Sequence, residues 1–196
     1  MMEAIPIKLI GMNNINRMVC TIVCVFWTAS CCSQNIPSNI TKYEKCVGSF
    51  CLLDLDGLYA NIPDAENYFV NGHIVLVNRG KQQYLRMTHY PGNPAGVMSL
   101  FEIGYLFDLD SCLYYDYDGG FLTNNNVPLG ELEDDIVEMQ GNPTWIEEKD
   151  GYRIYCYWED ESNSEYVREN NEYAYFIEYW IKDKRLVKLK FGFEYP

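Results

Sequence analysis

Histidine is scarce in this chain, and the familiar catalytic motifs are missing from it. Only two of its 196 residues are histidine, His73 and His89. The sequence has no Gly-x-Ser-x-Gly elbow, no glycine-rich phosphate-binding loop and no His-Glu-x-x-His motif. These absences exclude a motif-based assignment to the common hydrolases, nucleotide-binding enzymes and zinc peptidases. We therefore expect a protein that is not an enzyme and that holds no cofactor.

Basic residues are also few. The chain has 15 Lys and Arg against 28 Asp and Glu, which gives a formal net charge of −13. Nucleic acids and anionic lipid headgroups repel so acidic a protein, so neither is an expected partner. Solubility alone explains such acidity in many proteins, and a basic protein partner is the alternative.

A long hydrophobic run is missing as well. The longest apolar stretch, Met18 to Trp27, has about ten residues, too few to span the roughly 30 Å core of a bilayer as a helix. It is N-terminal and follows Arg17, and small residues come after it, which is typical of a secretory signal peptide. The sequence predicts a signal peptide over residues 1–30, with Met12 as the more economical start.

The residues that end this signal include two cysteines. Thr28-Ala29-Ser30-Cys31 resembles the lipobox of bacterial lipoprotein precursors, with Cys31 as the lipidated residue and Cys32 as a second register. The resemblance implies an exported lipoprotein, labelled by palmitate and anchored at the periplasmic or outer-membrane face of a bacterial cell envelope. An ordinary cleaved signal with incidental cysteines is the alternative. Residues 31–45 are polar and predict a flexible tether.

Four further cysteines follow the tether. Cys46 and Cys51 flank four residues and form a candidate loop-closing disulfide, which export would permit. Cys112 and Cys156 lie in apolar runs and read as buried free thiols. A nucleophilic pair of one of them with a histidine stays open, because such partners meet in space. The spacings match no zinc pattern, so no metal site is expected.

Apolar periodicity and turn residues predict two short helices and eight strands. The helices are expected at Pro63–Val70 and Glu131–Gln140. The strands are expected at His73–Asn78, Gln83–His89, Ser99–Asp108, Cys112–Tyr117, Thr144–Glu147, Tyr152–Glu159, Tyr173–Lys182 and Arg185–Glu194.

The order of these elements indicates an α+β fold, with short helices packed on antiparallel sheet. A loop, a short helix and a meander of about four strands occur twice, over residues 46–126 and 127–196. We therefore expect two tandem units, although residue identities do not repeat between them.

The segment Val127-Pro-Leu-Gly-Glu-Leu-Glu-Asp-Asp-Ile-Val-Glu-Met-Gln-Gly-Asn-Pro143, with the strand Tyr152–Trp158, resembles small bacterial lipoproteins of the SmpA/BamE type and the β-lactamase-inhibitor-like fold. The shared features are Leu129-Gly130, an acidic short helix and Gly141-Asn142-Pro143. The chain departs from the pattern at Leu132, where those families place a Ser or Thr N-cap. The resemblance implies a helix-on-sheet unit over residues 127–196 and brings no catalytic residues.

Aromatic residues concentrate in the second half of the chain. Tyr and Trp offer large contact areas at low entropic cost, so an outward-facing set would suit protein binding. We predict a binding face of Tyr155, Tyr157, Trp158, Tyr175, Tyr179 and Trp180, while packing beneath the helices is the alternative for each ring. The leading functional hypothesis is a non-catalytic protein-binding or scaffolding module at the envelope, and the alternative is an acidic inhibitor or immunity-type protein that blocks a hydrolase or toxin.

Overall fold

The computed structural model describes residues 40–194 apart from 92, 94–95 and 110–111. The predicted signal peptide, Met12, Cys31 and Cys32 lie outside the described residues. The elements are β1 (Cys46–Val47), β2 (Phe50–Cys51), α1 (Leu55–Asn61), the 3-10 helix η1 (Ala65–Tyr68), β3 (His73–Asn78), β4 (Gln83–Thr88), β5 (Leu100–Tyr105), the 3-10 helix η2 (Leu106–Asp108), β6 (Tyr115–Asp116), α2 (Glu133–Gln140), β7 (Trp145–Lys149), β8 (Tyr152–Asp160), α3 (Glu165–Glu169), β9 (Ala174–Lys182) and β10 (Arg185–Glu194).

Eight strands form one sheet in the order β6-β3-β4-β5-β10-β9-β8-β7. All neighbours are antiparallel except β3 and β6. The predicted α+β class is confirmed, with sheet as its dominant part. β5 pairs with β10 over five residue pairs, Gly104–Lys188 to Leu100–Gly192, so the sheet runs unbroken from one half of the chain to the other. This sheet joins strands from both sides of the predicted boundary between residues 126 and 127, and the prediction of two tandem units is not confirmed.

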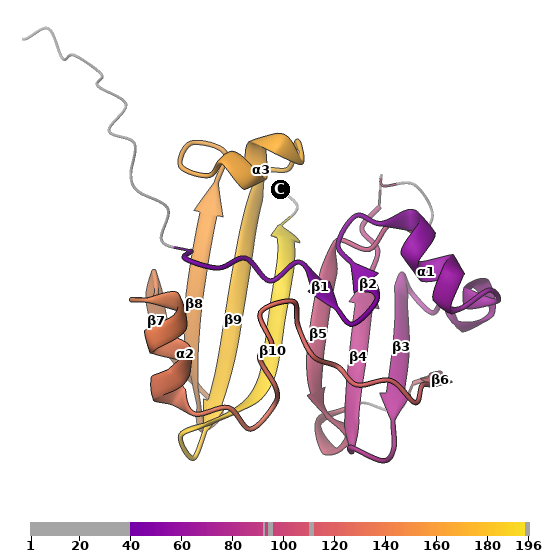
Figure 1. The fold of residues 1–196 in the computed structure, drawn as a ribbon, viewed down its shortest axis with the longest axis horizontal. Coiled ribbons are helices and arrows are strands. Elements are labelled where there is room, and N and C mark those ends of the chain that lie inside the picture. Colours follow the sequence, from indigo (N-terminus) through magenta and orange to yellow (C-terminus); the bar gives the residue numbers. More distant parts are fainter. Residues whose placement is uncertain (1–39, 92, 94–95, 110–111, 195–196) are drawn as a thin grey trace, which may run out of the picture. The chain divides into compact units, whose positions relative to one another are not determined.

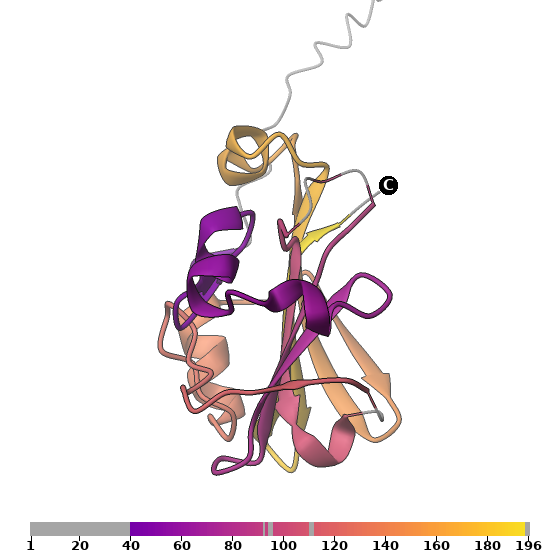
Figure 2. The ribbon, with the colours of Figure 1, turned by 90° about the vertical axis from the view of Figure 1, so that its right-hand side faces the viewer.

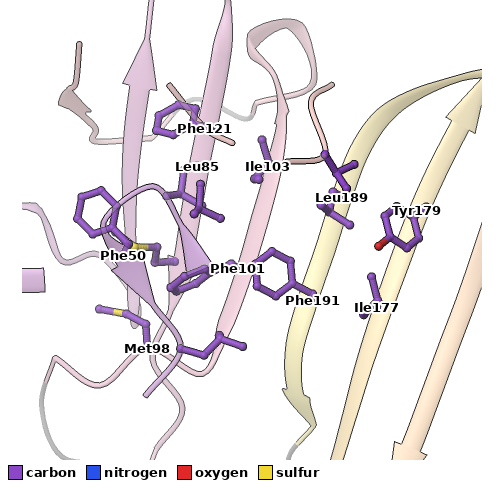
Figure 3. Close-up of a cluster of buried hydrophobic side chains, with 14 of the residues drawn as sticks. Phe50, Leu85, Met98, Phe101, Ile103, Phe121, Ile177, Tyr179, Leu189 and Phe191 are labelled. Carbon is purple, nitrogen blue, oxygen red and sulfur yellow. The ribbon is translucent and has the colours of Figure 1, made fainter. Parts of the chain in front are cut away.

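Helices α1 and α2 lie on the same side of this sheet (Figure 2). Beneath them, alternate residues of the strands form the core, because successive side chains of a strand point to opposite faces. Phe101 of β5 and Phe191 of β10 meet edge to face across the junction of the two halves, with ring centroids 5.6 Å apart (Figure 3).

Most of the predicted binding face was wrong, because four of its six residues belong to this core. Tyr155, Tyr157, Tyr175 and Tyr179 are all buried on the helix-covered side. They share it because the odd-numbered residues of β8 and β9 point beneath the helices. Only Trp158 and Trp180 of the predicted set, at even-numbered positions, face the other way.

The first predicted helix was wrong and the second right. Over Pro63–Val70 the structure has only the 3-10 turn η1, whereas α1 precedes it, capped by Asp54, whose side chain accepts from the backbone N–H groups of Asp56 and Gly57 at 3.1 Å. Helix α2 falls within the predicted Glu131–Gln140.

Leu132, at the N-cap of α2, gives no side-chain cap. The backbone of the β9–β10 hairpin replaces it, since the N–H of Glu133 donates to the carbonyl of Lys184 at 3.1 Å. Gly141, at a φ of 82°, ends the helix.

The predicted tether over residues 31–45 ends earlier than expected. From residue 40 the chain crosses β8, β9 and β10 before it reaches β1 (Figure 1). The Gln140 side chain brackets Lys42 like a neighbouring strand: its Oε1 accepts from the Lys42 N–H at 3.1 Å and its Nε2 donates to the Lys42 carbonyl at 2.6 Å. Ile40 and Glu44 are buried. We call residues 40–45 the strap, because they are packed rather than free.

The candidate disulfide pair, Cys46 and Cys51, is joined in the structure and links the paired strands β1 and β2. Cys112 and Cys156 are free thiols. Cys156 is buried as predicted, whereas Cys112 is only half-buried, because it packs at the margin of a small cluster of Val75, Val77 and Tyr84 on the sheet face opposite the helices.

Candidate binding surface

The far side of the sheet is covered unevenly. Over β3 and β4 it is covered by Leu106 of η2 and by Leu109 and Tyr114, which follow η2 in the chain. Over β7 to β10 it carries no helix among the elements of the described chain (Figure 2). We call this uncovered area the open face; it is formed by Trp145, Cys156, Trp158, Phe176, Glu178, Trp180, Lys188 and Lys190.

The open face is hollowed where β7 to β10 lie side by side. The hollow has a volume of about 490 Å³. At its rim stand Trp145 and Tyr173, whose exposed fractions of 47% and 51% are high for rings of this size. Its lining is Tyr90, Trp145, Cys156, Tyr157, Trp158, Tyr173, Phe176, Ile177, Glu178, Lys190 and Glu194.

Two carboxylates are held in place by indole donors. The Nε1–H of Trp158 donates to Oε2 of Glu194, and the Nε1–H of Trp180 donates to Oε2 of Glu178, each at 2.9 Å. Each bond fixes a charged group beside an aromatic ring. Such a fixed constellation is preorganised for a ligand and loses little entropy on binding.

Lysines of β9 and β10 lie over aromatic rings of the same face. A lysine ammonium is attracted to the negative face of a ring, so these contacts order the side chains. The distances from Nζ to ring centroid are 5.3 Å for Lys182 over Tyr152, 4.6 Å for Lys188 over Trp180 and 5.1 Å for Lys190 over Phe176.

Cys156 lies at the floor of the hollow but is poorly suited to nucleophilic chemistry. Burial, followed by the negative charges of Glu178 and Glu147, raises the pKa of its thiol to about 12. The reactive thiolate is therefore a minute fraction at neutral pH.

Neither histidine supplies a base for this thiol. The Nδ1 of His73 lies 2.8 Å from Oγ1 of Thr88, and the Nδ1 of His89 lies 3.1 Å from the carbonyl of Val97. His73 is on β3, five strands from β8 in the sheet, which at about 4.8 Å per strand places it more than 20 Å away. His89 lines a separate pocket of about 280 Å³ without a cysteine in its lining. The structure thus does not bring Cys156 together with either histidine.

The sequence predicted Trp158 and Trp180 as part of this surface, and most of its other residues were missed. The missed residues include Trp145, Tyr173, Phe176, Glu178, Lys190 and Glu194. The signal was the strict alternation along β9, which puts Phe176, Glu178 and Trp180 on one face and Tyr175 and Tyr179 on the other.

Comparisons with protein-family models, with curated proteins and with solved structures found no match for this chain. The resemblance to the SmpA/BamE type therefore stays a prediction. None of the helices that the structure describes is long and apolar enough to cross a membrane. Within the same residues, no three His, Cys, Asp or Glu side chains gather as a metal ion would require.

Proposed function

We propose that this protein is a non-catalytic binding module of the cell envelope and that it contacts a protein partner through the open face. The observation that carries the proposal is the exposure of Trp145 and Tyr173 at the rim of the hollow. Aromatic rings of this kind dominate the binding energy of protein interfaces when they become buried. The thiol of Cys156 is protonated at neutral pH, and no histidine is among the residues that line the hollow, which favours binding over catalysis.

A second candidate is an inhibitor or immunity-type protein. The net charge of −13 favours it, because an acidic surface complements the basic active site of a hydrolase or toxin. The identity of a captured partner distinguishes the two, since an inhibitor must co-purify with an enzyme or a toxin whose activity it suppresses.

The open face is tested by photo-crosslinking in the native cells. A benzoylphenylalanine placed at Tyr173 of the full-length chain is expected to yield a discrete protein adduct, because this ring borders the hollow. The matched control is the same group at Phe107 on η2, the most exposed large hydrophobic side chain in the described region, at 76%. Adducts of the same protein from both positions, or from Phe107 alone, would show that the open face is not the contact surface.

The export part of the proposal rests on the N-terminal residues and is tested separately. We propose that the chain is exported and anchored through a lipid on Cys31, with Cys32 as the alternative. The double variant Cys31→Ala, Cys32→Ala is expected to shift the protein from the membrane fraction to the soluble exported fraction and to lose palmitate label. Unchanged membrane association of the double variant would contradict the anchor.

A further inference from the structure

The hollow is lined by aromatic rings and carboxylates, and this chemistry indicates the kind of group that it binds. We infer that it binds a cationic side chain, arginine or lysine, from an extended basic segment of the partner. The inference deepens the proposed function and rests on it.

Some aromatic rings of this face already lie under a lysine of the protein, whereas others do not. Tyr152, Trp180 and Phe176 each lie under one of the protein's own lysines. No lysine or arginine of the described residues lies over Trp145, Trp158 or Tyr173. These three rings therefore keep a π-face for a cation from outside, and Trp is the best ring for this interaction.

The charge of the lining complements a cation. Glu178 and Glu194 each give one oxygen to an indole, and within residues 40–194 as described no hydrogen bond reaches the second oxygen of either. Two fixed carboxylates with a free acceptor suit the fork of donors that a guanidinium presents. The single positive charge in the lining, Lys190, has a glutamate on both sides of it in the sheet, Glu178 on β9 and Glu102 on β5.

The free edge of the sheet indicates an extended segment as the carrier of that cation. Strand β7 is the last strand of the sheet, so its outer edge pairs with no described strand. Trp145 begins β7 and stands at the hollow. A partner strand that adds to this edge would place alternate side chains on the open face, within reach of the hollow. The net charge of −13 would also steer a basic segment toward the protein.

The test is calorimetric titration of the full-length protein, purified in mild detergent, with the peptide acetyl-Ser-Arg-Ser-Arg-Ser-amide. The control peptide carries citrulline in place of arginine, which keeps the shape and removes the charge. Trp145→Leu and Glu194→Gln are each expected to weaken binding of the arginine peptide about tenfold, the size of a desolvated cation–π contact or charge-assisted hydrogen bond. The controls Phe107→Leu and Glu161→Gln change an aromatic residue and a glutamate at exposed positions outside the hollow and should leave affinity within about twofold.

Equal binding of the arginine and citrulline peptides would overturn the inference. So would a loss of affinity in Glu161→Gln as large as in Glu194→Gln, because that would reduce binding to overall charge. Binding of a neutral oligosaccharide in the hollow, with no binding of the arginine peptide, would assign the rings to sugar stacking instead. If Tyr173 crosslinks to a protein while the arginine peptide does not bind, the inference fails and the proposed function stands.

Discussion

Replacing Gly192 by alanine is expected to lower the free energy of unfolding by about 3 kcal/mol, the upper range for overpacking a well-packed site. Gly192 lies on β10 opposite Leu100 of β5, at the junction of the two halves. A Cβ atom there would come within 2.2 Å of the Ser99 carbonyl oxygen and 2.7 Å of the Leu100 Cα. Both are backbone atoms that cannot rotate away, and the Ser99 carbonyl also accepts the N–H of Phe193 at 2.9 Å. The melting temperature should fall by about 6–12 °C.

Gly80→Ala is the matched control. Its Cβ would find its nearest neighbour, Oδ1 of Asn78, at 3.4 Å, so we expect a change within about 0.5 kcal/mol. Chemical denaturation of the two variants measures the difference. Equal stabilities would mean that β5 and β10 do not pair as described. They would thereby contradict a single continuous sheet.

Replacing Glu159 by alanine is expected to destabilise the protein by about 3 kcal/mol and to free the strap. Glu159 is fully buried, and its two oxygens accept from the N–H of Ile40 at 2.7 Å and from the hydroxyl of Tyr43 at 2.5 Å. Alanine would leave the buried N–H of Ile40 without this acceptor, whereas the half-buried hydroxyl of Tyr43 would keep its contact with Ser164 Oγ at 3.0 Å. The loss of a buried acceptor costs about 1–3 kcal/mol, and the charged carboxylate places this change at the upper end of that range.

Limited trypsin digestion gives a local readout, because the strap contains Lys42 and Lys45. Cleavage after these lysines should be slow in the wild type and fast in Glu159→Ala. Glu161→Ala, an exposed acid two residues along the chain, is the matched control and should digest like the wild type. If the strap is cut equally fast in all three proteins, residues 40–45 are a flexible tether, as the sequence predicts, and not a packed segment.

The sequence predicted the long strands well because their signals are local. The bounds of β3 and β10 match the expected His73–Asn78 and Arg185–Glu194, where turn residues flank a run of alternating or β-branched side chains. Helix α1 was missed because Gly57 weakens its helical pattern, and Pro63 drew the expected helix into the following turn.

The strap and the binding surface were harder to predict because tertiary contacts decide both. Nothing local shows that polar residues 40–45 will find Gln140 and Glu159, which are about a hundred residues away in the sequence. Tyr179 and Trp180 are neighbours of similar chemistry, and the choice of which lies beneath the helices depends on the register of the whole sheet. Alternation separates the two faces but does not say which face is covered.

Hydrogen–deuterium exchange with and without the arginine peptide tests most directly that the open face is the binding surface. Because β7 is an edge strand, its amides should exchange readily in the free protein and slow when a segment adds to it. We predict that slowing is confined to residues 145–149 and 173–180. Slowing over the acidic helix α2 instead, with β7 unchanged, would contradict the open face as the site of binding.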